Sequence, residues 1–145
     1  MKWKIERMDG QDADVREVLA VYRSSGLGER RPIADGERFA AMVRNANLLV
    51  GCRIDGDLVG IARSISDFSY VTYLSDIAVA REHQRSGIGR ALIDGTRDAA
   101  PLAKIVLLSA PAATAYYPHI GFSAHSSAWV LNALADAQPP RGASM

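Results

Sequence analysis

The residues best suited to chemistry in this chain form a short basic stretch, Q-R-S-G-I-G-R, from Gln84 to Arg90. Apolar residues at helical spacing follow it, which predicts a helix that begins within the glycines. The first amides of a helix lack intrahelical partners and, with the positive end of the helix dipole, attract anions. Glycine lets the backbone approach a phosphate closely and adopt positive φ. The stretch therefore predicts a phosphate or pyrophosphate site; a glycine-rich turn that merely starts a helix is the alternative.

Glycine spacing distinguishes this loop from two other phosphate-binding loops. A Walker A loop needs a Gly-Lys pair, and the sequence contains none. A dinucleotide fingerprint needs a third glycine or an alanine where Leu92 stands. What remains is Q-x-x-G-x-G after a strand that ends at Ile77-Ala78-Val79. A nucleotide-binding switch domain is therefore disfavoured.

Composition narrows the class of protein. A chain of 145 residues suits one domain, and a net charge of +1 gives no support for nucleic-acid binding. No apolar run approaches a membrane span, and the first residues lack the apolar core of a signal peptide. The lone Cys52 precludes an internal disulfide and agrees with a cytoplasmic location. With three scattered histidines and one cysteine, no metal site is expected.

Residue periodicity predicts strands that alternate with helices. Strands are expected at residues 3–8, 48–54, 58–64, 70–79 and 104–109, with final strands ending at 128–134. Asp14 and Asp35 are expected to cap two helices, and a short helix is expected at Pro111 to Tyr117. Asp55-Gly56-Asp57 has the signature of a hairpin turn. The tail from 138 to 145 is expected to be disordered, which leaves one domain over residues 1–137.

This order of elements, together with two motifs, resembles the GNAT family of N-acetyltransferases along nearly the whole chain. One motif is the basic loop after its strand, and the other is A-x-x-Y-Y-x-x-x-G-F from Ala113 to Phe122. The resemblance implies an α+β fold with a central mixed, mostly antiparallel sheet flanked by helices. It also implies acetyl-CoA as cofactor, bound through the strand and the loop. The implied cofactor-binding residues are Ile77, Ala78, Val79, Gln84, Arg85, Ser86, Gly87, Ile88, Gly89 and Arg90.

The same resemblance assigns a general acid. Tyr117 falls at the position where relatives commonly carry one. Coenzyme A leaves as a thiolate whose pKa is near that of free cysteine, about 8.5, and a phenol with a pKa near 10 can donate a proton to it. The alternative is that Tyr117 only packs its helix against the cofactor.

The general base is less clearly marked. Relatives often place Glu or His at the positions of Tyr73 and Ser75, and neither of these is a usable base near neutral pH. Asp76 is the candidate base, although strand alternation points it away from both neighbours unless a bulge intervenes. A structural carboxylate is the alternative for Asp76. Deprotonation by a water chain, or binding of an already neutral amine, would then serve instead.

The implied reaction is direct attack of a primary amine of a small molecule or peptide on the thioester in a ternary complex. Glu29, Arg30 and Arg31 lie where the family shapes its acceptor pocket; a solvated charged face is the alternative. A homodimer is possible because dimers are common among relatives. A non-catalytic acyl-CoA-binding module with a sensing or interaction role is the alternative function.

Overall fold

The computed structural model describes residues 2–136. It contains two compact units, residues 1–109 and 110–145, and the expectation of one domain over residues 1–137 stays a prediction. The tail from 138 to 145, expected to be disordered, lies outside the described residues.

The first unit contains the whole sheet and the three longer helices. Its strands are β1 (Lys4–Met8), β2 (Leu48–Ile54), β3 (Asp57–Ser66), β4 (Val71–Val79) and β5 (Lys104–Val106). Its helices are α1 (Val15–Ser25), α2 (Gly36–Arg44) and α3 (Ile88–Ala99), with 3-10 turns η1 (Leu27–Arg30) and η2 (Arg81–His83). The second unit has η3 (Pro111–Ala113), α4 (Tyr116–His119) and η4 (Leu134–Asp136).

The five strands form one sheet in the order β1-β2-β3-β4-β5. Neighbouring strands are antiparallel except β4 and β5, which are parallel. The turn between β2 and β3 has positive φ at both Asp55 (50°) and Gly56 (85°), as a tight hairpin requires. The predicted mixed, mostly antiparallel sheet flanked by helices is confirmed.

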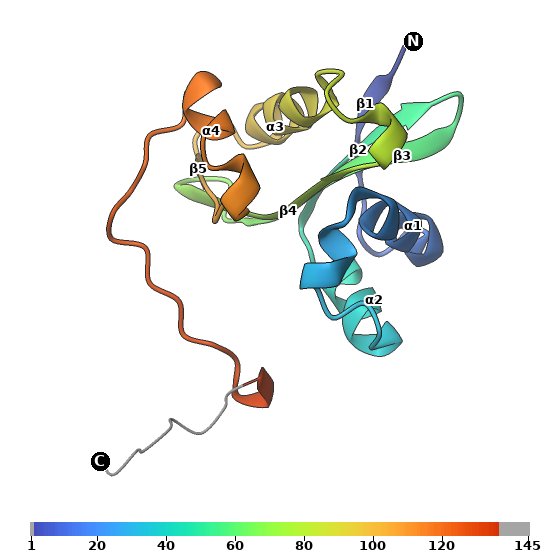
Figure 1. Ribbon diagram of the computed structural model, residues 1–145, viewed down its shortest axis with the longest axis horizontal. Coiled ribbons are helices and arrows are strands. Elements are labelled where there is room, and N and C mark those ends of the chain that lie inside the picture. The colour runs from blue at the N-terminus through green and yellow to red at the C-terminus, as the bar shows by residue number, and fades with distance from the viewer. Residues whose placement is uncertain (1, 137–145) are drawn as a thin grey trace. The chain divides into compact units, whose positions relative to one another are not determined.

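Helices cover both faces of the sheet. α1 and α2 lie on one face and α3 lies on the other (Figure 1). On the α1 and α2 face, Tyr22 and Phe39 meet edge to face with ring centroids 5.0 Å apart, within a buried apolar cluster. On the α3 face, Ile88 and Leu92 pack over Gly60 of β3. The sheet is therefore buried on both faces, with its central strands between two apolar layers.

Local side-chain bonds fix where the first two helices begin. Asp14 Oδ1 accepts from the backbone N–H of Arg16 at 3.0 Å, and Asp35 Oδ1 accepts from that of Arg38 at 3.1 Å. Both caps confirm the sequence prediction. Gly26, with φ at 89°, ends α1 in the left-handed conformation that glycine adopts without strain.

The predicted final strands are absent from the described part of the second unit. Residues 120–133 contain no helix or strand, and η4 follows them. Trp129 and Leu131 are 91% and 99% exposed. A run such as W-V-L has strand propensity, but a strand forms only where another edge satisfies its backbone groups. That prediction is wrong for these residues.

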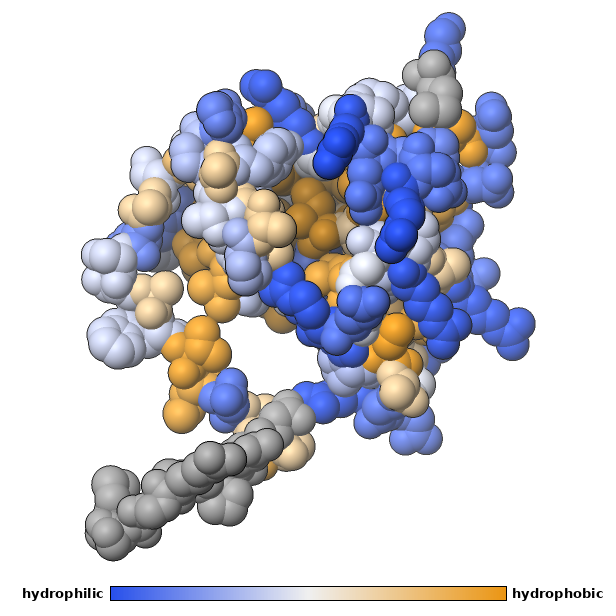
Figure 2. All heavy atoms as spheres, in the orientation of Figure 1, coloured by the Kyte–Doolittle hydropathy of each residue, from blue (hydrophilic) through white to orange (hydrophobic). Residues whose placement is uncertain are grey.

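Figure 2 shows hydrophilic side chains spread over the visible face of the first unit. Within residues 2–136, no helix combines the length and the apolar character needed to cross a bilayer. The same residues bring no three of His, Cys, Asp and Glu together as metal ligands.

Gly95→Val should push α3 away from the sheet. A Cβ at Gly95 would lie 2.9 Å from Ile5 Cγ2 and 3.0 Å from Val50 Cγ1. Because this layer is already close-packed, we expect the free energy of unfolding to fall by roughly 1–3 kcal/mol, measured by urea denaturation. Gly36→Ala is the control, since a Cβ there meets nothing within 4 Å. Equal stability of the two variants would contradict this packing.

Candidate functional site

The loop between β4 and α3 folds back on the strand that precedes it. Gln84 Nε2 donates to the carbonyl of Val79 at 2.9 Å, and Ser86 Oγ donates to the carbonyl of His83. Arg85 and Gly87 both have positive φ, 62° and 92°. Left-handed residues within such a loop turn successive backbone N–H groups inward, which forms a concavity for anions.

The start of α3 is left without a side-chain cap. Gly87 is its N-cap residue and makes no capping bond. The first helical bond is donated by Ala91 N–H to the carbonyl of Gly87 at 3.1 Å. The amides of Ile88, Gly89 and Arg90 therefore have no partner within the helix. Of the three residues, Ile88 is fully buried, whereas Gly89 is half-buried and Arg90 is exposed, so the last two carry the amides that solvent can reach.

The C-terminal half of β4 has an open edge. Ala80 N–H donates to Val59 of β3 at 2.8 Å, while the carbonyl of Val79 faces the other way, toward Gln84. Because backbone polar groups alternate along a strand, Ala78 directs its groups to β3, and Ile77 and Val79 direct theirs to the opposite edge. Of the three predicted contacts on β4, Ile77 and Val79 can therefore pair with a ligand at that edge.

The edge is open because β5 is short. β5 pairs with β4 only over Val71–Tyr73, and Val106 is its last residue. The predicted strand to residue 109 is therefore three residues shorter than expected. Beyond Tyr73, no described strand pairs with this edge of β4. The open edge leads directly to the loop with its uncapped helix start.

A buried carboxylate lies on the α1 face of β4. Asp76 Oδ2 accepts from Tyr22 Oη at 2.6 Å and from Arg63 Nε at 2.7 Å, while Oδ1 accepts from Arg31 Nε at 2.6 Å. The side chain of Asp76 is 0% exposed. Its oxygens therefore face charged and hydroxyl donors, with no water-accessible surface.

A bulge in β4 brings this carboxylate to the same face of the strand as Tyr73 and Ser75. Arg63 pairs with Asp76 and the next residue of β3 pairs with Leu74, so Ser75 is the extra residue of β4. Arg63 and Ile65 lie on one face of β3, so their partners Asp76 and Tyr73 also share a face, and Leu74 lies on the other. Ser75 Oγ accepts from Arg63 Nη2 at 2.9 Å, which places Ser75 beside Asp76 as well. Simple strand alternation is therefore interrupted here, as the sequence prediction allowed for a bulge.

The electrostatics of the cluster favour a charged carboxylate and a neutral phenol. Burial raises the pKa of Asp76, but the charges and hydrogen bonds of Arg63, Tyr22 and Arg31 outweigh burial and hold the pKa below its ordinary value. Burial and the neighbouring carboxylate raise the pKa of Tyr22 well above its usual range. A carboxylate with a lowered pKa and occupied oxygens is a weak proton acceptor.

The sequence did not predict that the four residues of this cluster contact one another. Asp76 was singled out as a candidate base and Arg31 as a residue at the implied acceptor pocket or on a solvated face, while Tyr22 and Arg63 were not predicted as site residues. The only local signals are polar residues on otherwise apolar faces: Tyr22 on the inner face of α1, and Arg63 and Asp76 in apolar strands. Such a residue indicates a buried partner without naming it.

Tyr117 belongs to the second unit, at the start of α4. Its ring lies edge to face against Phe122 and Tyr116, with centroid distances of 5.3 Å and 5.4 Å. The backbone N–H of Phe122 also donates to the carbonyl of Tyr117 at 3.1 Å. Burial, and then the neighbouring Tyr116, raise the pKa of Tyr117, so its hydroxyl is protonated at neutral pH. The predicted A-x-x-Y-Y-x-x-x-G-F motif thus forms a local aromatic cluster.

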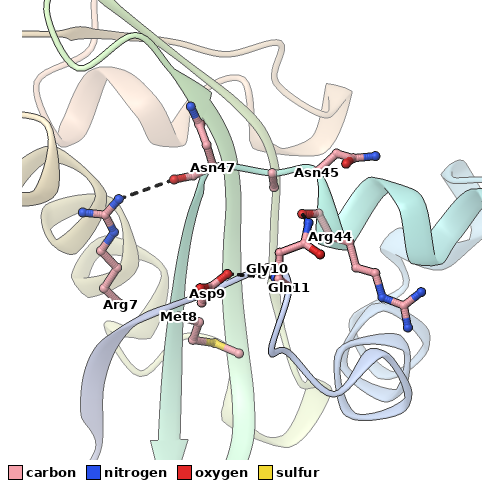
Figure 3. Close-up of a pocket in the computed structure, with 9 residues that line it drawn as sticks. Arg7, Met8, Asp9, Gly10, Gln11, Arg44, Asn45 and Asn47 are labelled. Carbon is pink, nitrogen blue, oxygen red and sulfur yellow. Dashed lines mark hydrogen bonds between the residues drawn. The ribbon is translucent and has the colours of Figure 1, made fainter.

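An open pocket of about 690 Å³ lies elsewhere, between the turn after β1 and the turn before β2 (Figure 3). Met8 at this end pairs with Leu49, whereas Val79 pairs with Gly60, toward the other end of the sheet. The pocket is therefore separate from the loop and the open edge. Figure 3 shows Arg7 donating to the carbonyl of Asn47, at 3.4 Å.

Asp76→Asn should destabilise the first unit strongly. The substitution leaves Arg31 and Arg63 without their shared counter-charge, and breaking a buried pair costs about 3–5 kcal/mol. Urea denaturation at neutral pH measures the loss. Tyr22→Phe is the matched control, because it removes one hydrogen bond to the same carboxylate and keeps both ion pairs; we expect it to cost about 1–3 kcal/mol. If Asp76→Asn loses no more stability than Tyr22→Phe, the ion pairs of Asp76 with Arg31 and Arg63 do not stabilise the fold.

Lowering the pH should reproduce part of the loss of stability expected for Asp76→Asn. Because the pKa of Asp76 is lowered on folding, its stabilisation is complete above the ordinary pKa of about 4 and is lost as pH falls through the folded value. The wild-type protein should therefore lose more stability between about pH 4 and pH 2 than Asp76→Asn does. Parallel curves for the two proteins over that range would count against the buried ion pairs.

Similarity to solved structures identifies the fold. A GNAT family acetyltransferase from Streptococcus pneumoniae TIGR4 superposes with a TM-score of 0.69 at 16% identity, covering 91% of this chain and 100% of that one. An integron cassette protein from the mobile metagenome of V. cholerae gives 0.69 at 15% identity, covering 91% and 92%. An aminoglycoside acetyltransferase from an uncultured soil metagenomic sample, solved with sisomicin, gives 0.65 at 20% identity, covering 90% and 95%.

At these identities the likeness establishes the shared fold and leaves the substrate open. No curated protein matches the sequence. The sequence profile of the acetyltransferase (GNAT) domain matches residues 18–135, which include β4, the loop, α3 and the aromatic motif. Since that match spans most of the chain, and the sheet and helices have the arrangement of the solved relatives, this protein belongs to the GNAT acetyltransferase family.

Proposed function

We propose that this protein transfers the acetyl group of acetyl-CoA to a primary amine of a small molecule or peptide. The observation that carries the proposal is the uncapped start of α3 beside the open edge of β4. The uncapped amides of Gly89 and Arg90 and two left-handed residues offer an anion site there. An unpaired strand edge leading into it suits an extended, amide-bearing arm. We expect the reaction to take place in the cytoplasm, which agrees with a single, buried free cysteine.

The residues of the first unit fit coenzyme A in two places. The amides of Gly89 and Arg90 would hold the pyrophosphate, with the exposed side chains of Arg85 and Arg90 beside them. The outward backbone groups of Ile77 and Val79 would pair with the pantetheine arm. When bound, acetyl-CoA supplies the acetyl group as an activated thioester.

Proton transfer is assigned to Tyr117 and to solvent. Tyr117 has a raised pKa and holds a proton that it can donate to a departing thiolate. Asp76 is a poor choice of base, because its oxygens are occupied and its pKa is lowered. We therefore favour an amine that binds in its neutral form or loses its proton to water.

Gly87→Val should abolish coenzyme A binding while the protein stays folded. Valine disfavours φ at 92° and would move the loop amides out of position. Isothermal titration calorimetry with coenzyme A measures the affinity.

Gly56→Val is the matched control for backbone strain. Gly56 has φ at 85° in the hairpin turn, and a Cβ there meets nothing within 4 Å. It should lose comparable stability and keep wild-type affinity. An unchanged affinity in Gly87→Val, or an equal loss in both variants, would exclude the loop as the binding site.

Tyr117→Phe should lower kcat and leave the affinity for acetyl-CoA nearly unchanged. The substitution removes one hydroxyl and keeps the ring that packs on Phe122. A hydroxyl that protonates the departing thiolate acts mainly in the transition state, so kcat falls and KM does not rise. General acid catalysis contributes about 10²–10⁴-fold, and we expect the low end because a thiolate leaves readily. Thiol release at saturating acetyl-CoA and amine measures kcat.

Tyr116→Phe is the control, because it removes a hydroxyl from the adjacent ring. We expect its kcat to stay within about twofold of wild type, a smaller change than any general-acid loss. If the kcat of Tyr117→Phe also stays within about twofold of wild type, the role of Tyr117 is limited to packing against Phe122. Weaker acetyl-CoA binding with unchanged turnover would assign Tyr117 to binding instead.

A further inference from the structure

The connector between α1 and α2 places one arginine on the strand that the proposed function uses. Arg31 follows η1, and its Nε donates to Asp76 Oδ1 at 2.6 Å. Its Nη2 donates to the carbonyl of Ser75 at 3.1 Å. Ser75 is the bulged residue of β4, two positions beyond the last pairing with β5 at Tyr73. The guanidinium of Arg31 therefore lies where the edge of β4 becomes open.

The cluster around Asp76 carries more positive than negative charge. Arg31 and Arg63 contribute two positive charges, Asp76 contributes one negative charge, and Tyr22 is neutral, which leaves a net charge of +1. Within the part of the chain that the structure describes, neither arginine bonds to a second carboxylate. One guanidinium charge is thus left without a protein counter-ion.

Arg31 is the arginine that presents this excess charge to a ligand. Its side chain is 24% exposed, whereas that of Arg63 is 10% exposed. A guanidinium has five N–H donors, and Arg31 uses three, to Asp76, Ser75 and the carbonyl of Arg30. Two N–H groups, one on each Nη, have no partner among the described residues. They form a pair of donors on a rigid, anchored fork.

We propose that Arg31 binds a carboxylate of the acceptor, so that the substrates are amino-acid-like amines. The inference rests on the proposed function and names the substrate class of the same site. A planar guanidinium matches a carboxylate with two parallel bonds, and its anchors on β4 hold it in place before the ligand arrives. A polycationic amine would instead meet a like charge at this position.

Matched acceptor pairs test the proposal. Thiol release from acetyl-CoA is measured with free amino acids and with their α-carboxamides, which keep the amine and side chain but lack the negative charge. The panel also includes dipeptides with a free carboxyl terminus and two polycationic amines, spermidine and kanamycin. For wild type, we expect kcat/KM for amino acids to exceed that for carboxamides by about 10- to 100-fold, as loss of a charge-assisted hydrogen bond implies. Spermidine and kanamycin should be the poorest acceptors.

Arg31→Gln should bring that ratio to within about threefold, since glutamine keeps a donor without the charge. Because the ratio compares two acceptors on one protein, a general loss of stability changes both rates and leaves the ratio intact. Arg30→Gln is the control: the Arg30 side chain is exposed, and only its backbone carbonyl contacts Arg31. It should keep the wild-type ratio.

The outcomes separate the two proposals. If carboxamides or polyamines are acetylated with the same kcat/KM as amino acids, Arg31 does not bind the acceptor carboxylate. The protein would still be an acetyltransferase. An amino-acid preference that survives in Arg31→Gln also overturns the role of Arg31. Transfer to dipeptides but not to free amino acids supports Arg31 and identifies a peptide carboxylate as its ligand. No thiol release with any amine, in a protein that binds coenzyme A, overturns both.

Discussion

One buried carboxylate joins the elements of the first unit that the candidate site requires. Asp76 connects β4 to β3 through Arg63, to α1 through Tyr22 and to the α1–α2 connector through Arg31. A buried carboxylate is stable only when charges and donors replace its water. These three partners must therefore come together when the unit folds, and the connector is held against the strand. A residue in that connector is thus as well positioned as one in the sheet.

The open edge of β4 and the start of α3 differ from the cluster around Asp76, because several of their backbone polar groups have no partner in the described structure. Helix α3 is anchored by Ile88 and Leu92 on the sheet, and so its first turn is rigid without a cap. Ile77 and the N–H of Val79 keep outward backbone groups without a strand partner because β5 ends at Val106, while the carbonyl of Val79 accepts from Gln84. Apolar packing supplies the stability, and the unpaired donors and acceptors are held in fixed positions for a ligand.

Signals within a few residues were read correctly from the sequence. The caps at Asp14 and Asp35, the hairpin at Asp55-Gly56 and the start of α3 all depend on contacts between near neighbours in the chain. Such contacts are encoded by residue type and spacing alone. The mixed sheet and the family followed from the order of these elements. The final strands did not, because W-V-L specifies a propensity and leaves the partner edge unspecified.

The sequence by itself determined the candidate loop and its neighbouring strand, because both are continuous in the chain. Only the tertiary structure decided the environment of Asp76, whose partners lie 13, 45 and 54 residues away. Residue type made Asp76 a candidate base, and its burial between two guanidiniums instead makes it an acceptor of fixed hydrogen bonds. The same contacts show that the guanidinium of Arg31, which the sequence placed either at the acceptor pocket or on a solvated face, is anchored on β4. Charge and donor count are local properties, but which donors remain free depends on residues that only folding brings together.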